Sequence, residues 1–162
     1  MTCLVATSAK QGWPQDLEDV LLLGDWCRPN FTIQEHVFND NQILQNPWRD
    51  KEAFYKAASY ADTVGQRILN NLTNYLNEIF GLKKSTQYWK IMCGYWLFKH
   101  VEVLLDRYTR LKLAYDLNPN LKTRCLSPED YQTPAHTHQW TVLIEEDSHL
   151  NWQVSSFLCA KM

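Results

Sequence analysis

The chain has 162 residues, of which 45% are hydrophobic and 21% are charged, and these values are typical of one globular domain with a substantial core. A net charge of −2 gives no overall attraction to nucleic acid or to anionic lipid. The sequence has no apolar run of roughly 18 residues and no basic leader, so we expect neither a membrane span nor a signal peptide. These features favour a cytoplasmic protein.

The aromatic content is high, with 7 Trp, 8 Tyr and 6 Phe residues. So many rings are typical of a deep core, a partner surface or a cleft that stacks on carbohydrate, and composition does not distinguish them. The 5 cysteines are scattered, with no C-x-x-C pair, so reduced and mostly buried thiols are expected instead of a disulfide framework.

Two short apolar stretches near the N-terminus predict β-strands. Residues 2–7 are β-branched and apolar, and residues 20–23 form a continuous apolar run that Gly24 ends. A run without polar alternation is typical of a strand covered on both faces, as in a parallel sheet. Residues 28–47 are rich in turn formers and in aromatic rings, which predicts a long functional loop.

A long amphipathic helix follows this loop. Asp50 is its expected N-cap, apolar residues recur at spacings of three and four from Phe54 to Ile79, and Gly81 is its expected C-cap. A second helix is expected from Ser85 or Thr86 to about residue 115. Its first half is apolar nearly all round, which predicts that this half is heavily buried.

The C-terminal part has weaker patterns. Residues 140–144 predict a third strand, and residues 151–160 predict a short helix. Together the elements predict a single α/β domain over residues 1–162, with a small parallel sheet and a prominent hairpin of two long helices.

The segment that follows the second strand carries the chemistry of most interest. Ligands of open α/β sheets bind at the carboxyl ends of the strands, where Gly24, Asp25, Trp26 and Arg28 are expected. Asp25 is suited to accept a proton from a hydroxyl nucleophile, Trp26 to stack on a sugar, and Arg28 to hold a phosphate or carboxylate. The alternative is an ordinary turn in which Trp26 packs and Arg28 is solvated.

Other polar residues have weaker functional indications. The loop that begins at Thr7 has small hydroxyl residues suited to a phosphate but no nucleotide-binding motif, so a turn or cap is the better interpretation. His36 lies alone in the aromatic loop, with either a structural or an acid–base role. His136 and His138, with His149 downstream, form an unspecific pattern, and we expect neither a metal nor another cofactor.

The second helix contributes further candidates. Gly94 in its interior allows a backbone or ligand to approach closely, and the aromatic residues around Trp96 favour core packing over a binding site. Asp106 and Arg107 are adjacent, and adjacent residues on a helix do not face each other, so they should bind different partners. Ion pairs that pack the helix are favoured over catalysis there.

Several segments together resemble a bacterial transferase family first noted in spirochaetes, found among genes for surface polysaccharide and O-antigen. The segment LLLGDWCRPN resembles its hLGEWC signature, with Asp25 in place of the usual Glu. A Trp-Arg-Asp segment at residue 48, a long helix, S-x-x-Y-W-x-I-x-x-G-x-W-L and D-R-[WY] follow in the family's order. The resemblance extends over residues 3 to about 158.

The resemblance implies a Rossmann-like α/β fold similar to the N-terminal part of longer, two-domain (GT-B-like) glycosyltransferases. It implies a saccharide acceptor bound here and a nucleotide-sugar donor bound mainly by a C-terminal part, so that this portion is expected to be inactive alone. Catalysis is then assigned to Asp25, with His36 as the alternative base. The residues expected to line the acceptor cleft are Thr7, Gly24, Trp26, Arg28, Gly94 and Trp96.

Two other classes of function remain open on the sequence. One is an interaction module without catalysis, which requires Trp89, Tyr95 and Trp96 to be exposed to solvent, whereas a core requires them to be buried. The other is a small metal-dependent hydrolase built on His136 and His138. Neither nucleic acid nor a membrane span is expected as a partner, and the apolar C-terminal segment makes self-association plausible.

Overall fold

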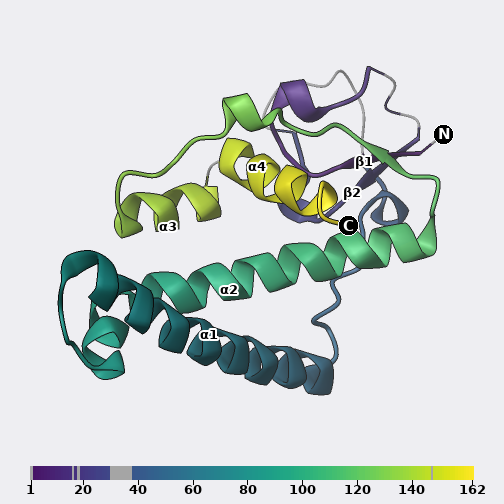
Figure 1. Ribbon diagram of the computed structural model, residues 1–162. Helices are drawn as coiled ribbons and strands as arrows, with labels where there is room; N and C mark the ends of the chain where they lie inside the picture. Colours follow the sequence, from purple (N-terminus) through teal and green to yellow (C-terminus); the bar gives the residue numbers. More distant parts are fainter. Residues whose placement is uncertain (1, 16, 18, 30–37, 147) are drawn as a thin grey trace. The chain divides into compact units, whose positions relative to one another are not determined.

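The structure is a computed structural model that describes residues 2–15, 17, 19–29, 38–146 and 148–162 (Figure 1). The chain divides into two compact units. The sheet unit comprises residues 1–46 and 107–162, and the hairpin unit comprises Pro47–Asp106. Each unit is described by itself below.

The sheet unit contains a small parallel sheet. Strands β1 (Cys3–Val5), β2 (Val20–Leu22) and β3 (Lys122–Thr123) lie in the order β2-β1-β3, and β1 is parallel to both neighbours. Leu4 lies opposite Leu21 of β2 and Thr123 of β3. The two N-terminal strands and their parallel direction are confirmed. The sequence did not reveal β3, because two residues without an apolar pattern give no strand signal.

The core of the sheet unit forms around β1 and β2. Leu4, Leu22 and Leu23 have no exposed surface, and Leu111 and Ala114 of helix α2 (Thr86–Leu117) belong to the same buried cluster. The continuous apolar run after residue 20 is therefore covered as the pattern predicts.

The hairpin unit contains helix α1 (Lys51–Phe80) and the first two-thirds of α2. The Asp50 carboxylate accepts a hydrogen bond from the Ala53 N–H at 2.7 Å, and Gly81 ends α1 with φ of 62°. Both caps and both helices are confirmed, but the heavy burial predicted for the first half of α2 is wrong, because Ile91, Met92 and Tyr95 are exposed. Few residues form the core between the helices: Ala61, Leu69, Trp89, Leu97 and Val101.

The C-terminal segment adds helices α3 (Thr137–Glu146) and α4 (Ser148–Cys159) to the sheet unit. The prediction of a strand at 140–144 is wrong. Trp140 and Ile144, four residues apart, are both buried, whereas Val142 between them is exposed, which is the periodicity of a helix. The predicted helix at 151–160 is confirmed by α4. Among the described residues, no helix is both long and apolar enough to cross a membrane.

Candidate functional site

The carboxyl ends of the parallel strands place the predicted signature at one edge of the sheet. Leu22 ends β2, and a single 3-10 turn, Asp25–Cys27, follows directly. The Leu44 N–H donates to the Leu22 carbonyl at 2.8 Å, so residues 43 and 44 lie beside the last residue of β2, parallel to it. Because parallel sheets bind ligands at this edge, the turn is where a site is expected.

Gly24 makes room for the Trp26 indole. A Cβ atom at position 24 would lie 2.2 to 2.6 Å from three carbons of the indole ring, far inside van der Waals contact. The φ of Gly24 is 179°, which any residue adopts, so the requirement for glycine is steric. The Gly-Asp-Trp sequence thus folds the indole back onto its own backbone.

Two arginines of α2 hold the Trp26 ring. The guanidinium carbon of Arg107 lies 4.2 Å from the ring centroid, and that of Arg110 lies 4.7 Å from it. The two arginines are three positions apart, so they share one face of the helix. Each is within the range of a cation–π interaction, which strengthens where water is excluded, and Arg110 is only 7% exposed.

Two asparagines orient these guanidinium groups. Arg107 donates to the Asn151 side-chain oxygen at 2.8 Å, and Arg110 donates to that of Asn46 at 3.1 Å. Buried Asn151 also donates through its Nδ2 to the Ile144 carbonyl at 2.9 Å. That second bond fixes which end of the amide faces Arg107. The signature turn, α2 and the α3–α4 segment therefore meet at one polar cluster, which we call the Trp26–arginine cluster (Trp26, Arg107, Arg110, Asn46 and Asn151).

The Trp26 indole nitrogen is a buried donor. Its Nε1 has almost no exposed surface and finds no acceptor among the residues that the structure describes. An unsatisfied buried donor costs about 1–3 kcal/mol. An oxygen of a ligand bound beside the ring would remove that cost.

Asp25 and Arg28 lie on the solvent side of the turn. The Asp25 side chain is 81% exposed, and its carboxylate lies 3.4 Å from the Arg28 Nε. An exposed pair of this kind contributes little to stability, so both groups can exchange partners readily. Their position leaves the carboxylate accessible to a hydroxyl from solvent.

Cys27 and Thr7 have structural contacts. Burial raises the pKa of the Cys27 thiol to about 12, so the thiol stays protonated and packs in the core. Buried Thr7 accepts from the Ala9 N–H at 3.0 Å, and its carbonyl accepts from the Trp13 indole N–H at 2.8 Å. These are the bonds of a turn. A contact between Thr7 and substrate stays a prediction.

The other predicted site residues belong to other parts of the chain. Gly94 and Trp96 belong to the hairpin unit, where Trp96 stacks on His100 with ring centroids 5.3 Å apart. A cleft shared with residues 24–28 therefore stays a prediction. His36 lies outside the described residues.

The histidines near residue 137 have capping contacts. The Gln139 N–H donates to the His136 Nδ1 at 3.1 Å, at the start of α3. His149 Nε2 lies 3.2 Å from the Asp130 carbonyl oxygen. Within residues 2–15, 17, 19–29, 38–146 and 148–162, no three His, Cys, Asp or Glu side chains are grouped closely enough to hold a metal ion.

Sequence reasoning missed the role of Arg107 and Arg110. It assigned Arg107 to a helix-packing ion pair, whereas the structure places both guanidinium groups on the Trp26 ring. The expectation that Asp106 and Arg107 bind different partners is confirmed, because Asp106 accepts from the Trp48 indole N–H and Arg107 binds Asn151. The spacing of three between two arginines was the available signal.

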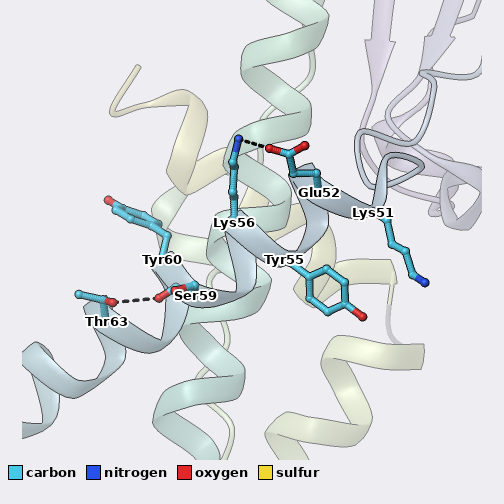
Figure 2. A pocket seen from close by; sticks show the side chains of 7 residues that line it. All are labelled: Lys51, Glu52, Tyr55, Lys56, Ser59, Tyr60 and Thr63. Atoms are coloured by element: carbon cyan, nitrogen blue, oxygen red, sulfur yellow. Dashed lines mark hydrogen bonds and ion pairs between the residues drawn. The ribbon is translucent and has the colours of Figure 1, made fainter.

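Several surface hollows occur in the hairpin unit, among them one of about 340 Å³ beside Gly94 and Tyr95. Figure 2 shows one along the first half of α1, where every lining side chain, from Lys51 to Thr63, comes from the same helix. Glu52 and Lys56 form an ion pair across it at 2.6 Å. With no opposing element, this hollow is an open helix face. Another, of about 270 Å³, is lined by residues of both helices, including Ala57, Ala61 and Glu102.

The small parallel sheet and the helices of the chain define an α/β protein, and the Trp26–arginine cluster lies at the carboxyl edge of that sheet. Comparison with protein families then gives the family. The chain matches the LIC12162 family transferase over residues 2–162 and belongs to that family. The resemblance to a transferase family over nearly the whole chain is confirmed. No curated protein and no solved structure gave a significant match.

Proposed function

We propose that this chain is the acceptor-side part of a glycosyltransferase that builds bacterial surface polysaccharide. The observation that carries the proposal is the Trp26 indole at the carboxyl edge of β2, held by Arg107 and Arg110. Trp26 is half-buried and lies beside the exposed Asp25 and Arg28, so a sugar that packs on the uncovered part of the indole could bind those polar groups through its hydroxyls. Membership of a transferase family supports the same class of chemistry.

In the proposed reaction an acceptor hydroxyl oxygen attacks the anomeric carbon of an activated sugar. A new glycosidic bond forms, the proton of that hydroxyl passes to the Asp25 carboxylate, and the nucleotide leaves with the electrons of the bond between the anomeric carbon and its phosphate oxygen. Asp25 is suited to this role because its side chain is exposed and its ion-pair partner, Arg28, is also exposed. Arg28 is then available for an anionic group, and His36 is the alternative base.

The division of labour is part of the proposal. The nucleotide-sugar donor would bind mainly outside these residues, in a further part of a longer transferase. Half-buried Arg107 and buried Arg110 hold the sugar platform, and Asp25 works from its solvent side. The other predicted acceptor contacts, Thr7, Gly94 and Trp96, remain proposed on the resemblance alone.

The test is binding followed by turnover. We expect saccharides, but not nucleotide sugars alone, to shift the Trp26 indole N–H signal in an NMR titration of the chain. Trp26→Leu should abolish saccharide binding, whereas Trp48→Leu, in the hairpin unit, should preserve it. Nucleotide binding without saccharide binding would overturn the acceptor assignment.

The catalytic role of Asp25 needs an active family member. There the equivalent of Asp25→Asn should lower kcat by about 10²-fold or more with little change in acceptor binding. Asp116→Asn is the matched control, since Asp116 is also exposed and forms an ion pair with a neighbour on the same turn, Lys112. Equal turnover by both variants would remove Asp25 from the mechanism.

The exposure of the aromatic residues neither supports nor excludes the alternative function as an interaction module. Trp89 is buried in the hairpin core, Trp96 is half-buried, and Tyr95 is 67% exposed. The rings named for a partner surface thus divide between core and solvent. Tyr95 belongs to an exposed apolar surface of α2, which is described in the next subsection.

A further inference from the structure

The turn between α1 and α2 and the start of α2 carry an unusual combination of residues. We call residues 79–101 the hairpin tip. Four of the chain's 16 basic residues and none of its 18 acidic residues lie in this segment. The chain as a whole is acidic, with a net charge of −2. Positive charge is therefore concentrated at this end of the hairpin unit (Figure 1).

An apolar stripe runs along the exposed side of α2 in the hairpin tip. Tyr88, Ile91, Met92 and Tyr95 are 37%, 75%, 62% and 67% exposed. Their spacing of three, one and three residues places them on one helix face. Ile91 and Met92 have no polar group that would favour solvent. A contiguous apolar face of this kind marks a surface that is covered in the working protein.

Lysines border the stripe at both ends. The Lys84 ammonium lies 5.3 Å from the centroid of the Tyr88 ring. Lys99 follows Tyr95 by four residues and so extends the same face of α2. Lys83 precedes Lys84 in the turn, beside Leu82, which is also partly exposed. An apolar centre with tyrosines and lysines at its border is the composition of a helix that lies in a membrane interface.

We propose that the hairpin tip binds the surface of an anionic lipid membrane, with Ile91 and Met92 inserted among the lipid chains. The lysines would lie at the level of the headgroups, where each basic residue is attracted by the negative surface potential. The tyrosines suit the boundary between headgroup and chain. The binding is peripheral, because neither helix crosses the bilayer.

The charges favour a membrane over the other partners that an apolar stripe can bind. Two copies of the chain joined through this stripe would bring Lys84 and Lys99 of both copies together, and like charges in contact oppose association. Nucleic acid would be bound mainly by rings that stack on bases, whereas the most exposed residue of the stripe, Ile91, and its neighbour Met92 are aliphatic. An anionic bilayer satisfies the lysines and the aliphatic residues at once.

Co-sedimentation with vesicles tests the proposal on the whole 162-residue chain. We expect binding to vesicles of phosphatidylcholine and phosphatidylglycerol in equal parts, and at least roughly tenfold weaker binding to phosphatidylcholine alone. Added salt should weaken the binding, because it screens the lysines. Equal binding to both vesicles, or none to the anionic ones, would overturn the proposal.

Matched variants locate the surface. Ile91→Ser with Met92→Ser, and separately Lys83→Gln with Lys84→Gln, should each weaken partition roughly tenfold or more. The controls remove similar groups elsewhere: Tyr55→Ser with Tyr60→Ser for exposed rings of α1, and Lys10→Gln with Lys122→Gln for exposed lysines of the sheet unit. Helical circular dichroism confirms that each variant is folded. Control variants that lose binding as strongly as the tip variants would contradict the assignment.

Light scattering tests whether a second copy of the chain, and not a membrane, covers the stripe. A dimer that forms at micromolar concentration and dissociates in the Ile91→Ser, Met92→Ser variant would assign the stripe to a second copy and overturn the membrane proposal. A monomer that binds anionic vesicles supports it. Because these readouts use no sugar, their result is independent of the proposed transferase activity.

Discussion

Residue 24 must be glycine because the Trp26 ring fills the space that its side chain would need. The Trp26 ring lies where a Cβ atom of residue 24 would be, within 2.2 to 2.6 Å of three ring carbons. Any larger residue must displace the indole from Arg107 and Arg110, and with it the platform of the proposed acceptor site. A glycine in the middle of a binding motif is explained here by packing alone.

We therefore expect Gly24→Ala to destabilise the protein by about 1–3 kcal/mol, the usual cost of an overpacked site. Urea unfolding measures the loss, and near-UV circular dichroism reports the displaced indole. Gly94→Ala is the matched control, because its Cβ would lie 3.1 Å from the flexible Lys90 side chain and in ordinary van der Waals contact, at 4.0 Å, with the Phe98 ring. Replacing a helical glycine there should be neutral or should stabilise by up to about 1 kcal/mol. Equal losses in both variants would contradict the steric explanation.

His100 gives the hairpin unit a dependence on pH. Its ring stacks on Trp96, and burial lowers its pKa from the ordinary value of 6.5. The unfolded chain then takes up a proton at higher pH than the folded chain, so stability is complete above about pH 6.5 and falls as the pH drops below it. Urea unfolding at pH 7.5 and pH 5.5 measures this loss. In His100→Gln the difference between the two pH values should be smaller, and an unchanged difference would exclude His100 as its source.

At the scale of elements, the long helices were predictable and the short elements were not. α1 has a capping residue at each end and many turns of apolar repeat, so the signals agree over 30 residues. α3 has only 10 residues, and its segment 140–144 also fits the pattern of a strand. Only the burial of both Trp140 and Ile144, four residues apart, distinguishes the helix. β3 depends entirely on its partner β1, which no local pattern encodes.

The caps of α1 permit a direct test of this local agreement. Gly81 adopts φ of 62° and ψ of 31°, and the Leu82 N–H closes the helix end by donating to the Asn77 carbonyl at 2.8 Å. Gly81→Ala places a Cβ in the left-handed region and should cost about 1–2 kcal/mol. Asp50→Ala removes the bond to the Ala53 N–H and should cost about 1 kcal/mol.

Thermal unfolding measures both capping losses. Asp50→Asn is the control at the N-cap, since asparagine keeps an acceptor for the same N–H and should retain most of the stability. At the C-cap, Gly81→Asn should lose less than Gly81→Ala, because asparagine tolerates the left-handed region better. The reverse order at either end would mean that the caps do not determine the ends of α1.

At the scale of the whole molecule, the sequence placed the signature turn correctly but not its partners. Asp25 and Trp26 follow β2 directly, so a local pattern and the edge rule for parallel sheets were sufficient. Arg107, Arg110 and Asn151 come from positions more than 80 residues away in the chain, and their approach to Trp26 depends on how α2 and α4 pack in the sheet unit. No local spacing in a single sequence predicts contacts between residues so far apart in the chain.

The two units also differ in the cores that hold them. The buried cluster of the sheet unit surrounds β1 and β2, whereas α1, with 30 residues, buries only Ala61, Gly65, Leu69 and Thr73. Regions with few buried apolar contacts open locally at a lower free energy than the whole protein. The amides of α1 should therefore exchange with solvent through an opening that leaves β1 and β2 closed.

Hydrogen exchange followed by mass spectrometry measures these openings, and Leu69→Ala separates them. Leu69 is fully buried in the hairpin core, so its truncation should lower the opening free energy of α1 by about 2–5 kcal/mol. The amides of β1 and β2 should keep their protection, because Leu69 belongs to the other cluster. Leu4→Ala is the counterpart and should affect the strands. If Leu69→Ala accelerates exchange equally in α1 and in the strands, the two units unfold as one, and the hairpin has no separate opening.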